Sequence, residues 1–135
     1  MRNLKLFTII GLTAFVMFSF TAFVQSKIWE VPAKYKSMKN PTDAKDKEGA
    51  NEGKALFAKQ CSSCHGKKGL GDGSKAEELK GDMGDFSSAK SQKQSDGEIF
   101  YKITEGRDDM PSFKKKIPND EDRWLVINYV RTLKK

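Results

Sequence analysis

Residues 61–66 read CSSCHG, and this stretch decides what kind of fold the rest of the chain forms. The chain contains two cysteines and one histidine, and all of them lie here, as Cys61, Cys64 and His65. The residue types that form disulfides, bind metals or attach cofactors are therefore concentrated in one short segment. The chemistry of this segment has to be judged from the sequence around it.

Length and composition limit the size of the core. A chain of 135 residues forms one small domain rather than two. Only 37% of the residues are hydrophobic, and many of these lie in the first two dozen positions. The remaining lysine-rich part, roughly 100 residues, has few apolar side chains to bury, so it is marginally stable unless another group fills its core. We expect a buried cofactor to fill it.

The balance of charge favours acidic partners. The chain carries 25 basic and 18 acidic residues, a net charge of +7. Such a surface attracts acidic proteins or anionic lipids. Acidic residues are mixed throughout and no stripe of basic and aromatic residues is present, so we predict no nucleic acid partner.

The N-terminus has the order of an export signal. Met1 to Lys5 is basic, and residues 6–24, LFTIIGLTAFVMFSFTAFV, carry no charge. Residues 1–26 are predicted to be a signal peptide cleaved after Ser26, or an N-terminal membrane anchor, because residues 6–24 are also long enough to span a bilayer. Both alternatives place the rest of the chain outside the cytoplasm, in the periplasm or on the extracytoplasmic face of the membrane.

The exported part divides into a leader and a domain. Residues 27–49 contain two prolines, many lysines and no sustained periodicity, which predicts an extended leader or linker. From Ala50 the pattern becomes helical and runs into Cys61. Residues 50–135 are therefore predicted to form the domain.

The domain reads as all-α with long loops. Ser95 and Glu98 have the spacing of a capping box, which predicts a helix that ends at Gly106. Another helix is expected after Pro118, capped by Asn119, and a short one near residues 75–80. No alternating strand pattern of useful length is present, and loops this long usually enclose something.

Two kinds of site fit CSSCHG poorly. A dithiol switch usually follows a strand in a βαβ unit, and the pattern here shows no such unit. Zinc takes four ligands, commonly two C-x-x-C pairs or one pair with two histidines, and this chain has one pair and one histidine. A carboxylate would have to complete a zinc site.

A covalently attached haem fits the segment better. Cysteines three residues apart on a helical turn lie on the same side, which suits thioether bonds to the two vinyl groups of one haem. The histidine directly after the second cysteine then reaches the iron, and C-x-x-C-H is the attachment signature of haem c. We predict one haem c, covalently held by Cys61 and Cys64, with His65 as the first axial ligand.

The chain resembles the cytochrome c superfamily over roughly Ala50 to Leu133. GKALFAKQCSSCHGKKGLGDG is similar to the first helix, haem motif and glycine-rich loop of the family, and GEIFYKITEGRDDMPSF to its middle helix and methionine loop. DEDRWLVINYVRTL is similar to its last helix. The resemblance implies a small cytochrome c-like fold of three to five helices around the haem, preceded by the signal or anchor helix. It also implies that Gly53 and Phe57 pack against the last helix near Tyr129.

The second axial ligand is expected to be a methionine, because His65 is the only histidine. Met110 lies in an irregular stretch and is followed by Pro111, which fixes the chain and presents the thioether from a loop. MPSF also resembles the methionine motif of the family. Met110 is therefore predicted to ligate the iron, and a core-filling role is the alternative.

Met83, in GDMGDF, is the second candidate ligand. It lies where many relatives carry a proline, and in the family the carbonyl of a proline in this loop often accepts a hydrogen bond from the haem histidine. The group that takes this part here is left open by the sequence.

An iron ligated by His65 and Met110 has no open position, so electron transfer is predicted rather than bond-making catalysis. The expected protein is a monohaem c-type cytochrome that is not an enzyme and exchanges electrons with redox proteins. A haem subunit of a larger respiratory or reductase complex is the alternative, and a haem enzyme or gas sensor with a displaceable ligand is a weaker one. Seven lysines in the predicted loops fit two roles, steering acidic partners or keeping the domain soluble, and solubility is the ordinary role of a single surface lysine: Lys67, Lys68, Lys75, Lys80, Lys114, Lys115 and Lys116.

Overall fold

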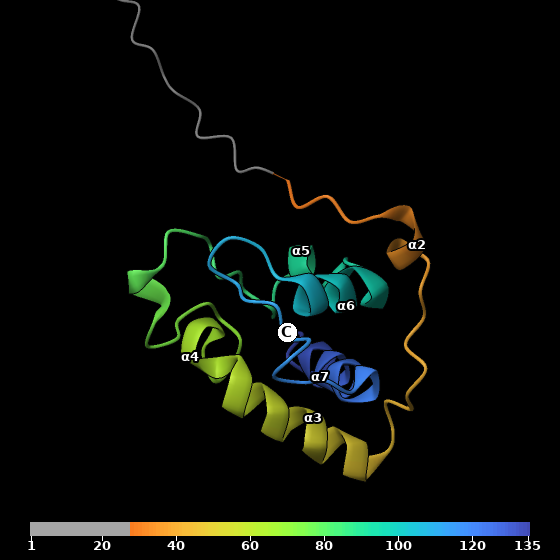
Figure 1. Ribbon diagram of the computed structural model, residues 1–135. Coiled ribbons are helices and arrows are strands. Elements are labelled where there is room, and N and C mark those ends of the chain that lie inside the picture. Colours follow the sequence, from red (N-terminus) through yellow and green to blue (C-terminus); the bar gives the residue numbers. More distant parts are fainter. Residues whose placement is uncertain (1–27) are drawn as a thin grey trace, which may run out of the picture.

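The computed structural model describes residues 28–135, which fold into helices and loops (Figure 1). Among these residues there is no strand, only an isolated bridge between Arg107 and Met110. The all-α prediction is therefore confirmed. Of the six α-helices within residues 28–135, three are single four-residue turns and three are long. In chain order the elements are α2 (Ala33–Lys36), α3 (Lys47–Gln60), α4 (Ser62–His65), the 3-10 helix η1 (Ala76–Glu78), α5 (Ala89–Gln92), α6 (Asp96–Glu105) and α7 (Asp120–Thr132).

The predicted ends of α6 are confirmed. The Ser95 hydroxyl accepts a hydrogen bond from the amide of Glu98, at 3.2 Å, and the Glu98 carboxylate accepts one from the amide of Ser95, at 2.7 Å. The helix ends at Gly106, whose φ of 68° lies in the left-handed region that favours glycine. The short predicted helix near residues 75–80 is present as η1.

The other two long helices also begin at polar caps. Asn119 caps α7 as predicted, accepting from the amide of Glu121. The first long helix starts at Lys47, earlier than the expected Ala50, because the Asp46 carboxylate accepts hydrogen bonds from the first free amides of the helix. This extra turn was missed because its side chains are mostly exposed and so add nothing to the apolar pattern that predicts the helix.

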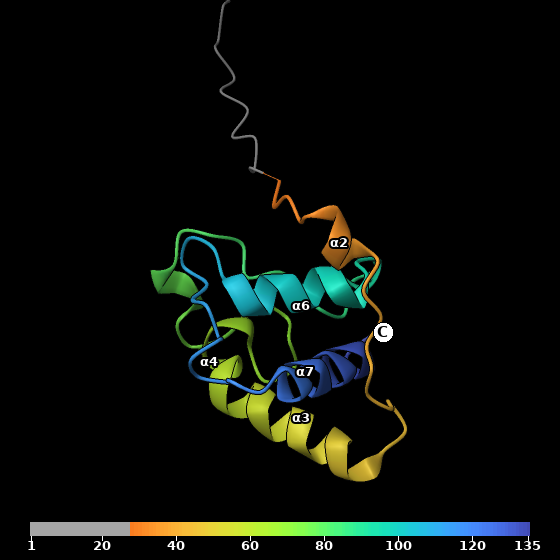
Figure 2. The ribbon, with the colours of Figure 1, turned by 45° about the vertical axis from the view of Figure 1, so that its right-hand side comes forward.

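Helices α3 and α7 cross in close contact, and α7 lies between α3 and α6 (Figure 2). A methyl group on Gly53 would overlap the backbone carbonyl of Leu125, so only glycine fits at the crossing. The Phe57 ring lies 5.1 Å from that of Tyr129, centroid to centroid. These are the contacts that the resemblance implied. The buried core contains Phe57, Phe100, Ile103, Phe113, Ile117, Trp124, Val126, Ile127 and Val130.

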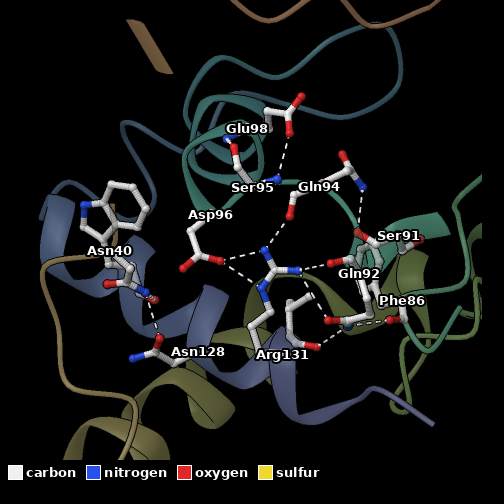
Figure 3. A network of polar contacts seen from close by, with 12 residues as sticks. Asn40, Phe86, Ser91, Gln92, Gln94, Ser95, Asp96, Glu98, Asn128 and Arg131 are labelled. Carbon is white, nitrogen blue, oxygen red and sulfur yellow. Dashed lines mark hydrogen bonds and ion pairs between the residues drawn. The ribbon is translucent and has the colours of Figure 1, made fainter. Parts of the chain in front are cut away.

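Arg131 ties the segment around α5 and α6 to α7 (Figure 3). Its guanidinium donates to the Asp96 carboxylate at 2.6 and 2.8 Å, and to the backbone carbonyls of Gln92 at 3.0 Å and Gln94 at 2.6 Å. The bonds join parts of the chain 35 to 39 residues apart. They fix the start of α6 against the end of α7.

Residues 28–46, here named the N-terminal strap, lie against the domain, although the sequence indicates an extended leader. Val31 is buried, and the Tyr35 ring lies 4.8 Å from that of Tyr101 on α6. At the far end, the Asn40 side chain donates to the Asn128 side-chain oxygen at 2.7 Å and to the Trp124 carbonyl at 3.2 Å. Apolar and amide contacts that are scattered in sequence therefore hold this segment in place.

The predicted signal or anchor, residues 1–26 with the apolar stretch 6–24, lies outside the described residues. From residue 28 onward the structure has no helix with the length and hydropathy needed to cross a bilayer.

Candidate functional site

The segment CSSCHG forms one helical turn at the end of α3. Cys61 ends α3 and begins α4, and its carbonyl accepts hydrogen bonds from the amides of Cys64, at 3.2 Å, and His65, at 2.9 Å. Cys61 and Cys64 are free, half-buried thiols rather than a disulfide. Because residues three apart in a helical turn share a side, the two sulfur atoms and the following imidazole belong to one compact unit.

Cys61 does not have the character of a redox-switch thiol. Burial, together with the neighbouring Cys64, raises the pKa of Cys61 to about 12, so Cys61 is a neutral thiol at pH 7. Switching cysteines work as thiolates, and their pKa is lowered by cationic or helix N-terminal surroundings.

His65 is held in one tautomer by the backbone. Its Nδ1 lies 2.7 Å from the carbonyl oxygen of Met83. A carbonyl can only accept a hydrogen bond, so Nδ1 carries the hydrogen and the lone pair is on Nε2. Burial lowers the pKa of His65, against a smaller opposite effect of the Met83 bond, so the ring is neutral at pH 7. A neutral imidazole with its lone pair on Nε2 is the form that binds metals.

Met83 supports His65 through its backbone, a contact that the sequence did not reveal. Its carbonyl is aimed by a turn in which the Gly84 amide donates to the Asp82 carboxylate at 2.8 Å and Gly84 has a φ of 71°. Every residue type has a backbone carbonyl, so the identity of residue 83 cannot signal this role. The one available signal was its place in the loop, where relatives have a proline.

The ring of Phe86 completes the support of His65. The two rings are stacked, with centroids 4.6 Å apart and planes 28° apart. The amide of Phe86 donates to the carbonyl of Gly69 at 2.7 Å, which joins the two ends of the loop that follows α4. The orientation of the imidazole is therefore fixed by a hydrogen bond at Nδ1 and by an aromatic face.

The glycine-rich loop satisfies the last carbonyls of α4. The amide of Gly71 donates to the carbonyl of His65 at 2.9 Å, and the amide of Gly73 to that of Cys64 at 3.2 Å. Lys75 donates in the same way to Ser63, at 2.8 Å. A helix end needs such donors, and the loop supplies them from its backbone amides.

Met110 lies on a tight turn after α6. The amide of Arg107 donates to the carbonyl of Met110 at 2.8 Å, and the amide of Met110 to the carbonyl of Arg107 at 2.9 Å. Between them, Asp108 has a φ of 51°, uncommon for a residue other than glycine. The Met110 side chain is half-buried and packs against the core. Sequence and structure agree that this methionine is presented by a loop and not by a helix face.

The Met110 loop lies at the same end of the molecule as α4. Figures 1 and 2 both show η1, α4 and the loop that joins α6 to α7 at this end. The Asp109 carboxylate accepts a hydrogen bond from the amide of Lys80 at 3.0 Å. This bond connects the Met110 loop to the loop that carries Met83.

Other sites for a metal are not present in the described part of the chain. Within residues 28–135, no group of three or more histidine, cysteine, aspartate or glutamate side chains is placed to hold a metal ion. A hollow of about 700 Å³ lies elsewhere, between the strap and the first turns of α3 and α7. Its rim includes Asp43, Asp46, Asp120 and Glu121 and none of the predicted site residues.

Comparison with known proteins identifies the family. A family model described as "Cytochrome C oxidase, cbb3-type, subunit III" matches residues 48–130. The chain belongs to the c-type cytochrome superfamily. A solved structure similar to this cytochrome is a chain of the Kuenenia stuttgartiensis reducing HAO-like protein complex Kustc0457/Kustc0458, with 27% sequence identity and a TM-score of 0.59. The match covers 70% of the cytochrome and 50% of that chain, so the cytochrome spans about half of its length. No curated protein matches the sequence.

Membership of the family implies a covalently bound haem c, and the residues present fit one. Cys61 and Cys64 are unbridged thiols, and His65 has its lone pair on Nε2. Thr104, in the last turn of α6 before the Met110 loop, buries a hydroxyl that has no hydrogen-bond partner among residues 28–135. A buried polar atom without a partner is expected where a bound group completes the site.

Proposed function

We propose that this cytochrome carries electrons outside the cytoplasm with a single haem c, whose iron cycles between Fe(II) and Fe(III). In this proposal Cys61 and Cys64 form the thioether bonds, and His65 and Met110 ligate the iron. The observation that carries it is the hydrogen bond from His65 Nδ1 to Met83, because it leaves Nε2 as the ligating atom directly beside the cysteine pair. The family supports the same function at the coarser level of an electron carrier.

The residues of the chain set the conditions for electron transfer. The haem supplies the one-electron chemistry when it is bound. The Met83 carbonyl and the Phe86 ring hold His65 in place, so the ligand has little to reorganise when the charge on the metal changes. A thioether ligand and a buried site both raise the reduction potential.

The charged surface suits acidic redox partners. The lysines singled out in the sequence, at 67, 68, 75, 80 and 114–116, are all exposed. Attraction between these lysines and an acidic surface speeds the encounter, and screening by salt weakens it. Transfer to an acidic partner is therefore expected to slow with rising ionic strength.

Export is part of the proposal and rests on the sequence. Residues 1–26 are proposed to direct the chain across the membrane, as a cleaved signal peptide or as an anchor through residues 6–24. Fractionation followed by N-terminal sequencing tests this: a mature protein that starts at residue 27 indicates cleavage, and an intact chain in the membrane fraction indicates an anchor. Haem-containing protein in the cytoplasm would contradict export.

A second candidate function is that of a haem subunit in a larger respiratory or reductase complex. Two observations favour it: the matching family is described as an oxidase subunit, and the similar solved chain belongs to a protein complex. Purification under native conditions from membranes separates the two functions. A stable stoichiometric partner supports the subunit, and a free monomer supports the mobile carrier.

Replacement of the two candidate methionines tests the axial ligand. Met110→Ala should abolish the long-wavelength absorption band of ferric iron ligated by methionine sulfur and lower the potential. Met83→Ala should preserve both, because Met83 acts through its backbone carbonyl on the His65 side. An unchanged band in Met110→Ala would refute the assignment. Fast carbon monoxide binding to the reduced wild-type protein would instead favour a haem enzyme or sensor.

A further inference from the structure

The strap begins at an aromatic contact with the end of α6. Trp29 is half-buried, and the guanidinium carbon of Arg107 lies 4.5 Å from the centroid of its ring. The ammonium group of Lys102, one turn earlier on α6, lies 5.5 Å from the same centroid. Two cations therefore lie over one indole ring, an attraction that is stronger when the groups are partly withdrawn from water.

Arg107 is the residue whose backbone positions Met110. The reciprocal hydrogen bonds of 2.8 and 2.9 Å between Arg107 and Met110 close the turn from which Met110 is presented. The Arg107 side chain also forms an ion pair with Asp108 at 3.2 Å. Asp108 is the residue with the uncommon positive φ. Arg107, the residue that contacts Trp29, is thus the first residue of this turn. Its side chain pairs with the carboxylate of Asp108, the second residue, which has the strained backbone.

Trp29 is itself held by a docked segment. Val31 is buried, and Tyr35 is tilted against Tyr101 on α6 with ring centroids 4.8 Å apart. The backbone of Tyr35 lies so close to Gly97 that a methyl group there would overlap its carbonyl. Figure 2 shows the strap running along α6 from the side of its last turn to α2 near its first. The tryptophan is therefore delivered to Arg107 by a segment fixed at several points.

We propose that Trp29 is a positioning residue for Met110: by holding Arg107, the strap keeps the Met110 turn closed, in the form from which Met110 would ligate the iron of a bound haem. This rests on the proposed ligation by Met110. A surface turn with a residue at positive φ is prone to local opening, and opening displaces the thioether from the iron. Contact with the indole ring stabilises the closed turn, so it lowers the fraction of time in which the iron accepts an external ligand.

The rate at which imidazole binds the ferric protein measures this opening, because Met110 must first leave the iron. Trp29→Leu keeps an apolar side chain but removes the aromatic face, and should raise the rate by roughly threefold to thirtyfold. Trp29→Phe keeps a face for the cation and should stay within about twofold of wild type. The methionine band should also be lost at a lower urea concentration in Trp29→Leu than in wild type.

Tyr35→Leu is the matched control. It removes an aromatic residue of the same strap that touches Tyr101 and not the Met110 turn. It should lower overall stability and raise the imidazole rate clearly less than Trp29→Leu does, because Val31 and the Tyr35 backbone still hold the strap. Equal acceleration in Tyr35→Leu and Trp29→Leu would overturn the proposal, because the effect would then be a general loosening of the strap. No acceleration in Trp29→Leu would overturn it directly.

Arg107→Gln approaches the same contact from the other side, and this single variant remains informative if Trp29→Leu folds poorly. Arg107→Gln alone should speed imidazole binding. In the double variant with Trp29→Leu, the total increase in rate should be smaller than the product of the two single increases. Independent, multiplying effects would overturn the coupling. Met110→Ala separates failure of the proposed ligation from failure of the proposed role of Trp29. If this variant leaves the methionine band unchanged, the ligation by Met110 is wrong.

Discussion

At the scale of single residues, the candidate site depends on backbone atoms as much as on side chains. The carbonyl of Met83 sets the tautomer of His65, and the amides of the glycine-rich loop satisfy the carbonyls of α4. Almost every residue type has these backbone atoms, so the identity of a residue does not indicate that its backbone takes part in the site. The sequence predicted the thiols and the imidazole because these groups are specific to cysteine and histidine. It could not predict which carbonyl lies against the imidazole.

Gly73 packs closely against the backbone of the turn that carries the cysteines. Its α-carbon lies against the backbone of Ser63 and Cys64, and a methyl group there would overlap both carbonyl groups. Gly73→Ala must therefore shift the turn that carries the cysteines, and we expect it to cost about 2 kcal/mol or more of the free energy of unfolding. Urea unfolding of the haem-containing protein, with the yield of attached haem, measures both effects.

Gly81→Ala is the control for this prediction. Gly81 is exposed in the same loop, and a methyl group on it would meet only the end of the Met83 side chain at 3.6 Å. Its effect should stay within about 0.5 kcal/mol. Comparable losses of stability in the two variants would show that the close contact of Gly73 with the cysteine turn is not the cause.

At the scale of elements, helix ends were more predictable than helix docking. The capping box at Ser95 and Glu98, the glycine at 106 and the cap at Asn119 are local signals, and each lies within a few residues of the helix end it determines. The start of α3 was misplaced by three residues, because an aspartate in a charged, exposed segment is a weak signal. In the structure the Asp46 backbone is extended, and its carboxylate turns back to accept from the first amides of the helix.

The crossing of α3 and α7 gives a prediction at this scale. Gly53→Ala places a methyl group against the rigid carbonyl of Leu125, so the helices have to separate. We expect a loss of about 2–3 kcal/mol in the free energy of unfolding, in spite of the better helix propensity of alanine. Chemical denaturation measures it.

Gly49→Ala tests whether the backbone contact is the cause. The new methyl group would lie 2.9 Å from the Asp46 carboxylate and from the end of the Leu125 side chain. Both can shift more easily than a backbone carbonyl, although the carboxylate has to adjust its capping bond to the Gly49 amide. The gain in helix propensity, about 1 kcal/mol, should largely offset that adjustment. If Gly49→Ala destabilises the protein as much as Gly53→Ala, the explanation by close backbone approach is wrong.

At the scale of the whole molecule, a few polar side chains join parts of the chain that are far apart in sequence. Arg131 connects α7 to the residues around α5 and α6, and Asn128 connects α7 to the strap through Asn40. Both lie on α7, which is therefore the element against which the other segments are fixed. No local pattern identifies these pairs, since each partner alone reads as an ordinary polar residue.

Arg131→Met should show how much this connection contributes. The guanidinium and the Asp96 side chain are 28% and 33% exposed, and removing the arginine leaves the carboxylate and two carbonyls without their donor. We expect a loss of about 2–3 kcal/mol, discounted from the value for a fully buried pair. Thermal unfolding at constant salt measures it.

Lys114→Met is the comparison, because Lys114 forms an ion pair with Glu105 at the surface, where their side chains are 53% and 34% exposed. Its removal should cost less than about 1 kcal/mol. Equal effects of the two substitutions would mean that the Arg131 network contributes no more than an exposed ion pair.

What the amino-acid sequence determined by itself is local: the helical attachment turn at 61–65, the caps of α6 and α7, the all-α class and the presentation of Met110 before Pro111. These follow from contiguous residues, because capping, helical spacing and proline act within a few positions. The tertiary structure decided which carbonyl holds His65, how the strap docks, and that Trp29 lies on Arg107. The His65–Met83 contact joins residues 18 positions apart and the Trp29–Arg107 contact residues 78 positions apart, and only the packing of the whole chain brings them together.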